Sequence, residues 1–252
     1  MPAPSASVNL TQALAQQRVF IGTITPSSNT IVERVTLAIL QAFPSVSAHF
    51  SRTPVVGAKD PFPDRYDLDS MLVAARLLAH AKLDVICWNG SKGATIGFKH
   101  DRKLCERIHL ETGVTSTSST LALEDALRKR GIQRIALVSP YAKPYQEKSI
   151  AALEQEGYHC IAEAHNGLAD NYSYSQIPAD TIAAMLRKVA RARPEAIVTV
   201  CTNFPAAPVI PALEDELDIP IFDTTSLGVW HALKLTGVTT NSGRVWGRLF
   251  EQ

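Results

Sequence analysis

The chain has 252 residues, enough for one large domain or two of ordinary size, and its hydrophobic content of 46% allows a sizeable core. Its 25 basic and 24 acidic residues leave a formal net charge of +1, which argues against nucleic acid or an anionic membrane as a partner. No apolar run approaches the roughly 18 residues of a membrane span. The N-terminal stretch MPAPSASVNLTQALAQQ lacks the basic start and the apolar run of a signal peptide.

Short β-branched runs alternate with longer segments of helical periodicity along the chain. In chain order we expect strands at 18–25, 46–52, 84–89, 134–139, 159–164, 196–201 and 219–225, and helices at 30–43, 67–81, 99–111, 144–156, 179–191, 207–217 and 227–234. GVTSTS is a short strand or loop, LALEDALRKRG is a helix closed by Gly131, and a Pro-rich loop holds Asp60 and Pro61. The alternation predicts an α/β fold with parallel sheets and helices on both faces.

The pattern of elements restarts halfway along the chain. Three stretches match later ones in the same order: IGTITPSS (21–28) with IALVSPYA (135–142), DVICWNGSKG (84–93) with EAIVTVCTNF (195–204), and SSTLALEDAL (118–127) with TTSLGVWHAL (224–233). We therefore expect two pseudo-symmetric α/β halves, residues 1–120 and 121–234, with residues 235–252 packing back on the core.

The duplication also predicts where a ligand binds. Open parallel sheets bind ligands at the carboxyl ends of their strands, so the two halves should turn those ends to a shared cleft. The matches place Pro26 opposite Pro140 and Gly90 opposite Cys201, and we expect all four to line one cavity.

Four cysteines are spread along the chain without a CxxC pair or a zinc-ligand spacing: Cys87, Cys105, Cys160 and Cys201. We expect free thiols in the reducing cytoplasm. Cys201 ends an apolar strand and precedes a helix, where backbone N–H groups and the helix dipole favour the thiolate. The alternative is that Cys201 is a buried strand cysteine that only packs in the core. We expect this packing role for Cys87, which lies inside its strand. Cys105 and Cys160 receive no role.

Hydroxyl-rich stretches follow several strands. TPSSNT (25–30) with Asn29 forms a cradle for a carboxylate or phosphate, or only caps the next helix. Tyr141 in SPY offers a phenol to a carboxylate or packs at the boundary between the halves. TSTSST (115–120) and DTTS (223–226) line the cleft or cap helices.

Other chemistry has no support in the sequence. His100, His109 and His231 lie on helical stretches, are not spaced as metal ligands, and are expected at the surface or in packing. No dinucleotide fingerprint, P-loop or nucleophile elbow occurs. We therefore expect neither a cofactor nor a metal.

Several motifs together resemble the aspartate/glutamate racemase superfamily, in its branch of maleate cis-trans isomerases and arylmalonate decarboxylases: PSSNT after the first strand, the turn after DVI, SPY, DN near 170 and CTN at 201–203. The resemblance runs from IGTITPSSNT to GRLF. It implies that Asn29, Tyr141 and Asn171 hold substrate carboxylates and that Cys201 matches the second catalytic cysteine of maleate isomerases.

The first cysteine of the isomerases' CTSG motif is absent. This segment is Gly90, Ser91, Lys92, Gly93, and arylmalonate decarboxylase is similar in having glycine there. That enzyme's first loop differs from PSSNT, and Lys92 matches neither pattern. Two thiols that face one carbon can remove a proton from one side and return it on the other. One thiol cannot do both, but it can protonate an enediolate made by loss of carbon dioxide. A thiol of ordinary pKa, about 8.5, is a usable acid for this step.

The sequence therefore predicts a cofactor-independent lyase that decarboxylates a small dicarboxylate, with Cys201 as the acid. The expected substrate-binding residues are Pro26, Ser27, Asn29, Gly90, Ser91, Lys92, Tyr141, Asn171, Thr202 and Asn203. The first alternative is an isomerase or racemase in which Lys92, Cys87 or water replaces the missing thiol. The second is a carboxylate-binding protein whose catalytic pair has decayed. A homo-oligomer is possible.

Overall fold

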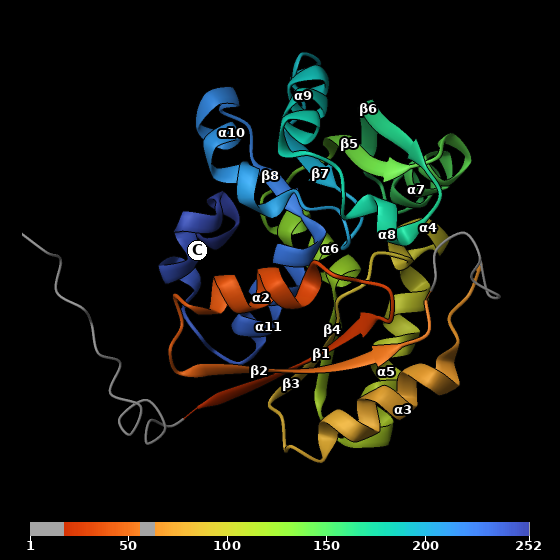
Figure 1. The fold of residues 1–252 in the computed structure, drawn as a ribbon, viewed down its shortest axis with the longest axis vertical. Coiled ribbons are helices and arrows are strands. Elements are labelled where there is room, and N and C mark those ends of the chain that lie inside the picture. Colours follow the sequence, from red (N-terminus) through yellow and green to blue (C-terminus); the bar gives the residue numbers. More distant parts are fainter. Residues whose placement is uncertain (1–17, 56–63, 252) are drawn as a thin grey trace, which may run out of the picture.

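The computed structural model describes residues 18–55 and 64–251. Within them the chain forms two four-stranded parallel sheets flanked by helices, in the orders β2-β1-β3-β4 and β6-β5-β7-β8 (Figure 1). The expected α/β fold with two similar halves is confirmed. The N-terminal stretch and the Pro-rich loop with Asp60 and Pro61 lie outside the described residues.

The strands form where β-branched and apolar residues cluster. The first sheet contains β1 (Val19–Pro26), β2 (Val46–Thr53), β3 (Val85–Trp88) and β4 (Thr115–Ser118). The second contains β5 (Arg134–Tyr141), β6 (His159–Leu168), β7 (Ala196–Thr199) and β8 (Ile221–Asp223). The central strands β3 and β7 are buried along their whole length, as expected of parallel strands covered by helices on both faces.

Helices connect these strands. They are α2 (Val32–Leu40), α3 (Leu68–Ala79), α4 (Gly93–Ile96), α5 (Phe98–Thr112), α6 (Ser119–Lys129), α7 (Lys143–Gln155), α8 (Asn171–Tyr174), α9 (Ala179–Ala190), α10 (Ile210–Leu217) and α11 (Thr224–Leu235). Three 3-10 segments are η2 (Ala207–Val209), η3 (Thr240–Trp246) and η4 (Arg248–Phe250). The expectation that 227 begins the last helix is wrong. Asp223 accepts a 2.8 Å hydrogen bond from the Ser226 amide and starts α11 at Thr224.

The register of the two sheets confirms two of the internal matches and corrects the third. Ile24 lies opposite Trp88 in the first sheet, and Val138 lies opposite Thr199 in the second. Both pairs agree with the sequence alignment of the halves. At the outer strands, however, Ser118 pairs with Trp88 as Asp223 pairs with Thr199. Ser118 is therefore equivalent to Asp223, one residue before the partner that the ungapped match assigns.

The two halves are interlocked. Helix α11 comes from the second half but packs against α2 and β3 of the first (Figure 1), and the side-chain amide of Asn89 donates to the Thr225 carbonyl at 3.1 Å. Near the C-terminus, Leu249 and Phe250 are buried, and the Arg248 amide donates to the Glu214 carboxylate at 2.7 Å. The two halves therefore pack directly against each other, and this contact fixes the positions of their strand ends.

No helix within 18–55 and 64–251 is long and apolar enough to cross a membrane. The four cysteines are unbridged. In the same described part of the chain, no three His, Cys, Asp or Glu side chains gather as a metal site.

Candidate active site

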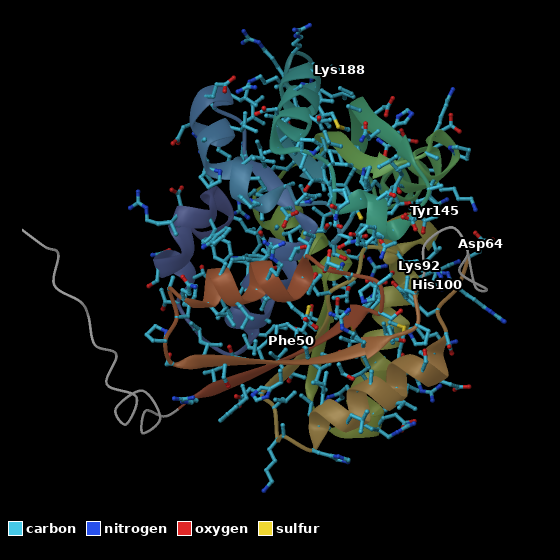
Figure 2. All side chains as sticks on the ribbon, in the orientation of Figure 1. Phe50, Asp64, Lys92, His100, Tyr145 and Lys188 are labelled. Carbon is cyan, nitrogen blue, oxygen red and sulfur yellow. The ribbon has the colours of Figure 1, made fainter. Side chains whose placement is uncertain are left out.

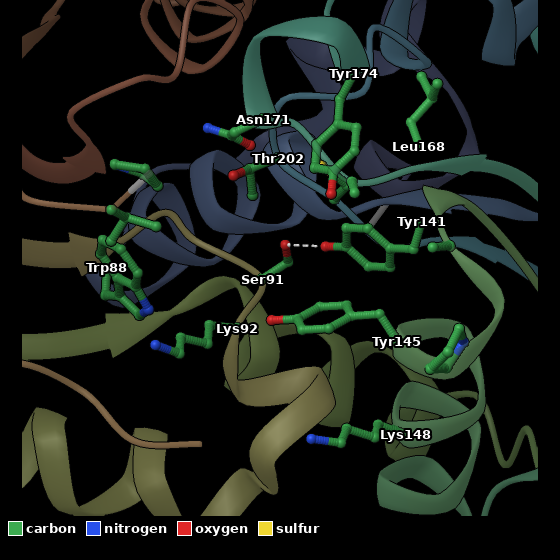
Figure 3. Close-up of a pocket in the computed structure, with 16 residues that line it drawn as sticks. Trp88, Ser91, Lys92, Tyr141, Tyr145, Lys148, Leu168, Asn171, Tyr174 and Thr202 are labelled. Carbon is green, nitrogen blue, oxygen red and sulfur yellow. Dashed lines mark hydrogen bonds between the residues drawn. The ribbon is translucent and has the colours of Figure 1, made fainter. Parts of the chain in front are cut away.

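A cavity of about 330 Å³ lies where the carboxyl ends of β1, β3, β5 and β7 meet (Figure 3). Its lining residues come from both halves: Pro26, Val55, Trp88, Ser91, Lys92, Tyr141, Ala142, Pro144, Tyr145, Lys148, Leu168, Ala169, Asn171, Tyr174, Cys201 and Thr202. This is the position at which open parallel sheets bind ligands.

The predicted site residues divide into two groups. Those that line the cavity are Pro26, Ser91, Lys92, Tyr141, Asn171, Cys201 and Thr202. Ser27, Asn29, Gly90 and Asn203 are not among its lining residues, nor is Pro140, which was expected there with Pro26. Sequence position alone found the strand ends but not the direction in which each side chain points.

Cys201 follows β7 and is only 3% exposed. Its φ of 154° is positive, a sparsely populated backbone conformation for a residue other than glycine. Its amide donates to the Thr224 hydroxyl at 3.2 Å. The sulfur faces the amides of Asn203 and Phe204 and the Tyr141 hydroxyl.

The backbone amides favour the thiolate, as expected, but they do not decide the protonation state of Cys201. Burial raises the pKa of Cys201 to about 12 and outweighs the backbone and Tyr141 hydrogen bonds, which lower it. The nearby Asp223 carboxylate raises it further. At neutral pH the group is a protonated thiol, and so a potential proton donor.

Tyr141 stands between Cys201 and the opposite loop. Its hydroxyl lies 3.0 Å from the Ser91 hydroxyl (Figure 3). Burial raises the pKa of Tyr141 well above its usual value, so it stays neutral. Its ring meets those of Tyr145 and Tyr174 edge-to-face, with centroids 4.8 and 5.5 Å apart. These three rings form a rigid wall that carries hydroxyl groups.

Asn29 and Asn203 join the two halves beneath the cavity. The side-chain oxygen of Asn29 accepts from two amides of the first turn of α2, each at 2.8 Å, and its nitrogen donates to the Thr202 hydroxyl at 3.2 Å. Asn203 accepts from the Thr30 amide at 2.9 Å and donates to the Asn171 carbonyl at 2.6 Å. The capping alternative for Asn29 is therefore observed, and Asn203 serves to hold loops together.

The serines of the first loop bind a neighbouring segment. Ser27 is exposed and Ser28 is half-buried, and both donate to the Val55 carbonyl, at 3.4 and 2.6 Å. Ser28 also accepts from the side-chain amide of Asn171 at 2.6 Å. One N–H of the Asn171 side-chain amide is therefore engaged by Ser28, while Asn171 also lines the cavity.

Hydroxyls after β4 and β8 form a buried layer behind the cavity. Thr225 donates to the Thr202 carbonyl at 3.1 Å, and Ser119 donates to Asn89 at 2.8 Å. Burial raises the pKa of Asp223 to about 6, although hydrogen bonds from Ser226 and Thr199 oppose the shift. Neither stretch contributes a lining residue, so these hydroxyls position the site without facing it.

The absence of a side chain at Gly90 leaves room for the indole of Trp88. A Cβ atom at this position would lie 2.2 Å from Cζ2 of Trp88, far inside van der Waals contact. The φ of Gly90 is not positive, so backbone conformation does not demand glycine there. The indole of Trp88 lines the cavity and fills the space that a side chain at 90 would enter.

Two basic side chains lie on one side of the cavity. Lys92 and Lys148 both line it, and the described lining contains no acidic side chain. Lys148 pairs with Asp64 at 2.8 Å, and the two lysines together hold the pKa of Asp64 below its usual value. Figure 2 shows Lys92, Asp64 and Tyr145 near one edge of the molecule. This charge suits a carboxylate ligand.

Sequence reasoning missed several lining residues, among them Trp88, Tyr145, Lys148 and Tyr174. A signal for two of them existed. Tyr145 and Lys148 lie three residues apart on α7 and so share a helical face, directly after the Tyr141 that was expected in the site. Trp88 gave no signal, because a strand residue of this type is ordinarily core.

The profile of the arylmalonate decarboxylase family matches residues 57–250. The chain therefore belongs to this family, which confirms the resemblance to its branch of the superfamily. A maleate isomerase of Nocardia farcinica is 28% identical over 227 residues, covering 85% of this chain and 88% of the relative. The arylmalonate decarboxylase of Bordetella bronchiseptica is 24% identical, over 75% of this chain and 81% of its own.

Solved structures of this family have the same fold. The maleate isomerase Iso of Pseudomonas putida S16 superimposes with a TM-score of 0.84 at 23% identity, covering 92% of this chain and 99% of its own. A cysteine-to-serine mutant of the Nocardia farcinica isomerase, with a covalently bound succinylcysteine intermediate, has a TM-score of 0.83 at 26% identity, over 92% and 98% of the two chains. The chain is accordingly an enzyme of the decarboxylase and isomerase branch.

Proposed function

We propose that the chain is a cofactor-independent lyase that removes one carboxylate from a small substituted dicarboxylate and protonates the resulting enediolate through Cys201. The inequality of the two strand ends carries this proposal: a thiol follows β7, whereas the Trp88 indole covers Gly90 after β3. Moving a proton between both faces of one carbon needs an acid or base on each side. Decarboxylation needs one acid only, because loss of carbon dioxide itself generates the carbanion.

The retained carboxylate has hydroxyl donors where Tyr141 meets the loop after β3. Ser91 and Tyr141 present paired hydroxyls 3.0 Å apart, and Lys92 adds a positive charge at the same loop. As negative charge moves onto the carboxylate oxygens of the enediolate, these groups stabilise it. Fixed donors in a water-poor cavity act more strongly than the same groups in water.

The proton then comes from the thiol. The bond to the leaving carboxylate breaks, carbon dioxide departs, and the electron pair stays on the substrate as the enediolate. Cys201 transfers its S–H proton to the α-carbon. The amides of Asn203 and Phe204 and the Tyr141 hydroxyl face the sulfur and stabilise the thiolate until water returns a proton. Because burial keeps the pKa of the free thiol at about 12, the acid starts each cycle protonated.

A maleate-type cis-trans isomerase is the second candidate, favoured by the 28% identity to the Nocardia farcinica isomerase. This reaction, like racemisation, needs a second reacting group in place of the missing thiol. Lys92 lines the cavity and is the stronger choice. Cys87 is buried inside β3, where burial raises its pKa well above the usual value, and it is absent from the lining.

The two candidates differ in product. Wild-type enzyme is incubated separately with methylmalonate, methyl(phenyl)malonate and maleate, and carbon dioxide and the organic acids are quantified; of the two malonates, only the disubstituted one gives a chiral product. We expect carbon dioxide from a malonate, one enantiomer of a chiral monoacid, and loss of both in Cys201→Ala. Conversion of maleate to fumarate without carbon dioxide from any malonate would replace the lyase with the isomerase.

A cytoplasmic location is part of this proposal. Four unbridged cysteines support the cytoplasm as the location, where disulfides are rare. The expected homo-oligomer stays a prediction.

A further inference from the structure

Trp88 is held in place from behind the cavity. It ends β3 and is 1% exposed, and its indole nitrogen donates to the Tyr66 hydroxyl at 3.1 Å. Tyr66 in turn donates to the carboxylate of Asp101 on α5. The Tyr66 and Trp88 rings meet edge-to-face with centroids 5.9 Å apart. The indole therefore has one defined orientation, fixed by hydrogen bonds and by ring packing.

Two glycines of the loop after β3 make room for this group. Gly90 admits the indole, as its missing Cβ shows, and a Cβ at Gly93 would lie 2.0 Å from a carboxylate oxygen of Asp101. Neither glycine has a positive φ. In the second half the aligned positions carry Cys201 and Phe204. The glycines of the first half are thus explained by the Trp88–Tyr66–Asp101 group and not by a turn that only glycine can adopt.

We infer that Trp88 determines the stereochemistry of this enzyme. Its indole occupies the volume of the missing thiol and closes the Gly90 side of the substrate, so that protons reach the reacting carbon from Cys201 alone. Tyr66 and Asp101 are positioning residues that keep the indole against Gly90. The inference rests on the proposed function, because it takes Cys201 as the proton donor.

One consequence concerns the first strand end itself. Gly90→Cys alone should not restore a second proton path, because the indole already fills the space. Removing the indole first, with Trp88→Val, should make the new thiol useful. Valine suits a strand position and leaves the opening next to residue 90. The effects of the two substitutions should therefore depend on each other.

A stability cycle tests the packing without any substrate. Gly90→Ala should lower the Tm of the wild type by about 5 °C, the size expected for overpacking in a chain of this length. In the Trp88→Val background the same change should lower the Tm by at most about 1 °C. Trp88→Phe provides a milder background if Trp88→Val does not fold. An equal loss of Tm in all backgrounds would overturn the inference that the indole excludes a side chain at 90.

The catalytic arm measures exchange at the α-carbon of the optically pure product in deuterium oxide with reductant present. The double variant Trp88→Val/Gly90→Cys should exchange and racemise the product at least about tenfold faster than either single variant, still below the full effect of an evolved acid–base group. Equal exchange in Gly90→Cys alone, or no gain in a folded double variant, would overturn the inference. If wild-type enzyme releases no carbon dioxide from any malonate, the proposed function fails, while the Tm cycle still judges the role of Trp88.

Tyr66→Phe separates positioning from mere support. This variant keeps the ring and loses the hydroxyl that joins Trp88 to Asp101. We expect lower optical purity of the product, because a mobile indole opens the Gly90 side. A fall in Tm or in rate with optical purity unchanged would show that Tyr66 only supports the fold.

Discussion

Strands β3 and β7 occupy equivalent positions in the two sheets, but different side chains follow them. Both are short, fully buried central strands with the same pairing register. After β7, a thiol faces the cavity and Asn203 ties the loops together. After β3, the position aligned with Cys201 is Gly90, which has no side chain, and Lys92 faces the cavity instead. The two strand ends thus share their geometry, and in the proposed reaction one supplies the proton while the other supplies a closed wall and a positive charge.

The largest effect should come from removing the reagent. Cys201→Ala should lower turnover at least about a hundredfold, the lower range for general acid–base catalysis, with the Tm nearly unchanged. Cys160→Ala is a matched control, since this cysteine lies on β6 outside the cavity lining. Turnover is followed as carbon dioxide release. Near-normal turnover in Cys201→Ala would show that Cys201 is not the proton donor, so that neither strand end supplies the acid.

A smaller effect is expected at the residue between the two ends. Tyr141→Phe removes a hydroxyl that faces both the Ser91 hydroxyl and the Cys201 sulfur. Loss of a hydrogen bond to a charged group costs about 1.5–3 kcal/mol, so kcat/KM should fall about 10- to 100-fold. Tyr158→Phe removes a hydroxyl outside the cavity lining and is the control. An unchanged kcat/KM would assign Tyr141 to packing alone.

The charge on the β3 side should affect binding more than chemistry. Lys92→Met keeps the length of the side chain and removes the ammonium group, and KM should rise about tenfold with a smaller change in kcat. Lys188→Met is the control, because Lys188 is exposed on α9 and lies far from Lys92 (Figure 2). A large loss of kcat with KM unchanged would instead make Lys92 the second reacting group and favour the isomerase.

Much of the fold could be predicted because its signals are local. Strand and helix periodicity located the main elements, and the internal matches gave the two similar sheets. The misplaced start of α11 depended on Asp223: capping was one of the two alternatives for the DTTS stretch, but the hydrophobic pattern alone set the expected start of the helix at 227. Packing of α11 on the other half could not be predicted, since a swapped helix and an unswapped one have the same amphipathic pattern.

The site was predictable only to the level of the strand ends. Parallel-sheet geometry gathers Pro26, Tyr141 and Cys201 at one edge, and this requires no knowledge of side-chain packing. Whether Asn203 faces the cavity or a neighbouring loop depends on partners far away in the sequence. The same holds for the pKa of Cys201, where local N–H groups were evident but burial, which dominates, is a property of the whole fold.

The smallest expected effect is the absence of a pH response where an ordinary thiol would give one. The active form of Cys201 in the proposed reaction is the thiol, and its raised pKa keeps that form dominant as pH rises until about 12. An acid of ordinary pKa, about 8.5, would be only about one-tenth protonated at pH 9.5. We therefore expect kcat/KM for carbon dioxide release to stay nearly constant from about pH 7 to 9.5, and iodoacetamide to inactivate the enzyme slowly over this range, because alkylation requires the thiolate. The charges that act on the sulfur do not change over this range: Tyr141 stays neutral, and Asp223, with a pKa of about 6, is already ionised above pH 7. A decline in kcat/KM centred near pH 8.5, with no parallel change in Tm over the same pH range, would show that burial does not raise the pKa of the thiol in the working enzyme. Cys201 after β7 would then not be the buried acid that we contrast with the closed wall after β3.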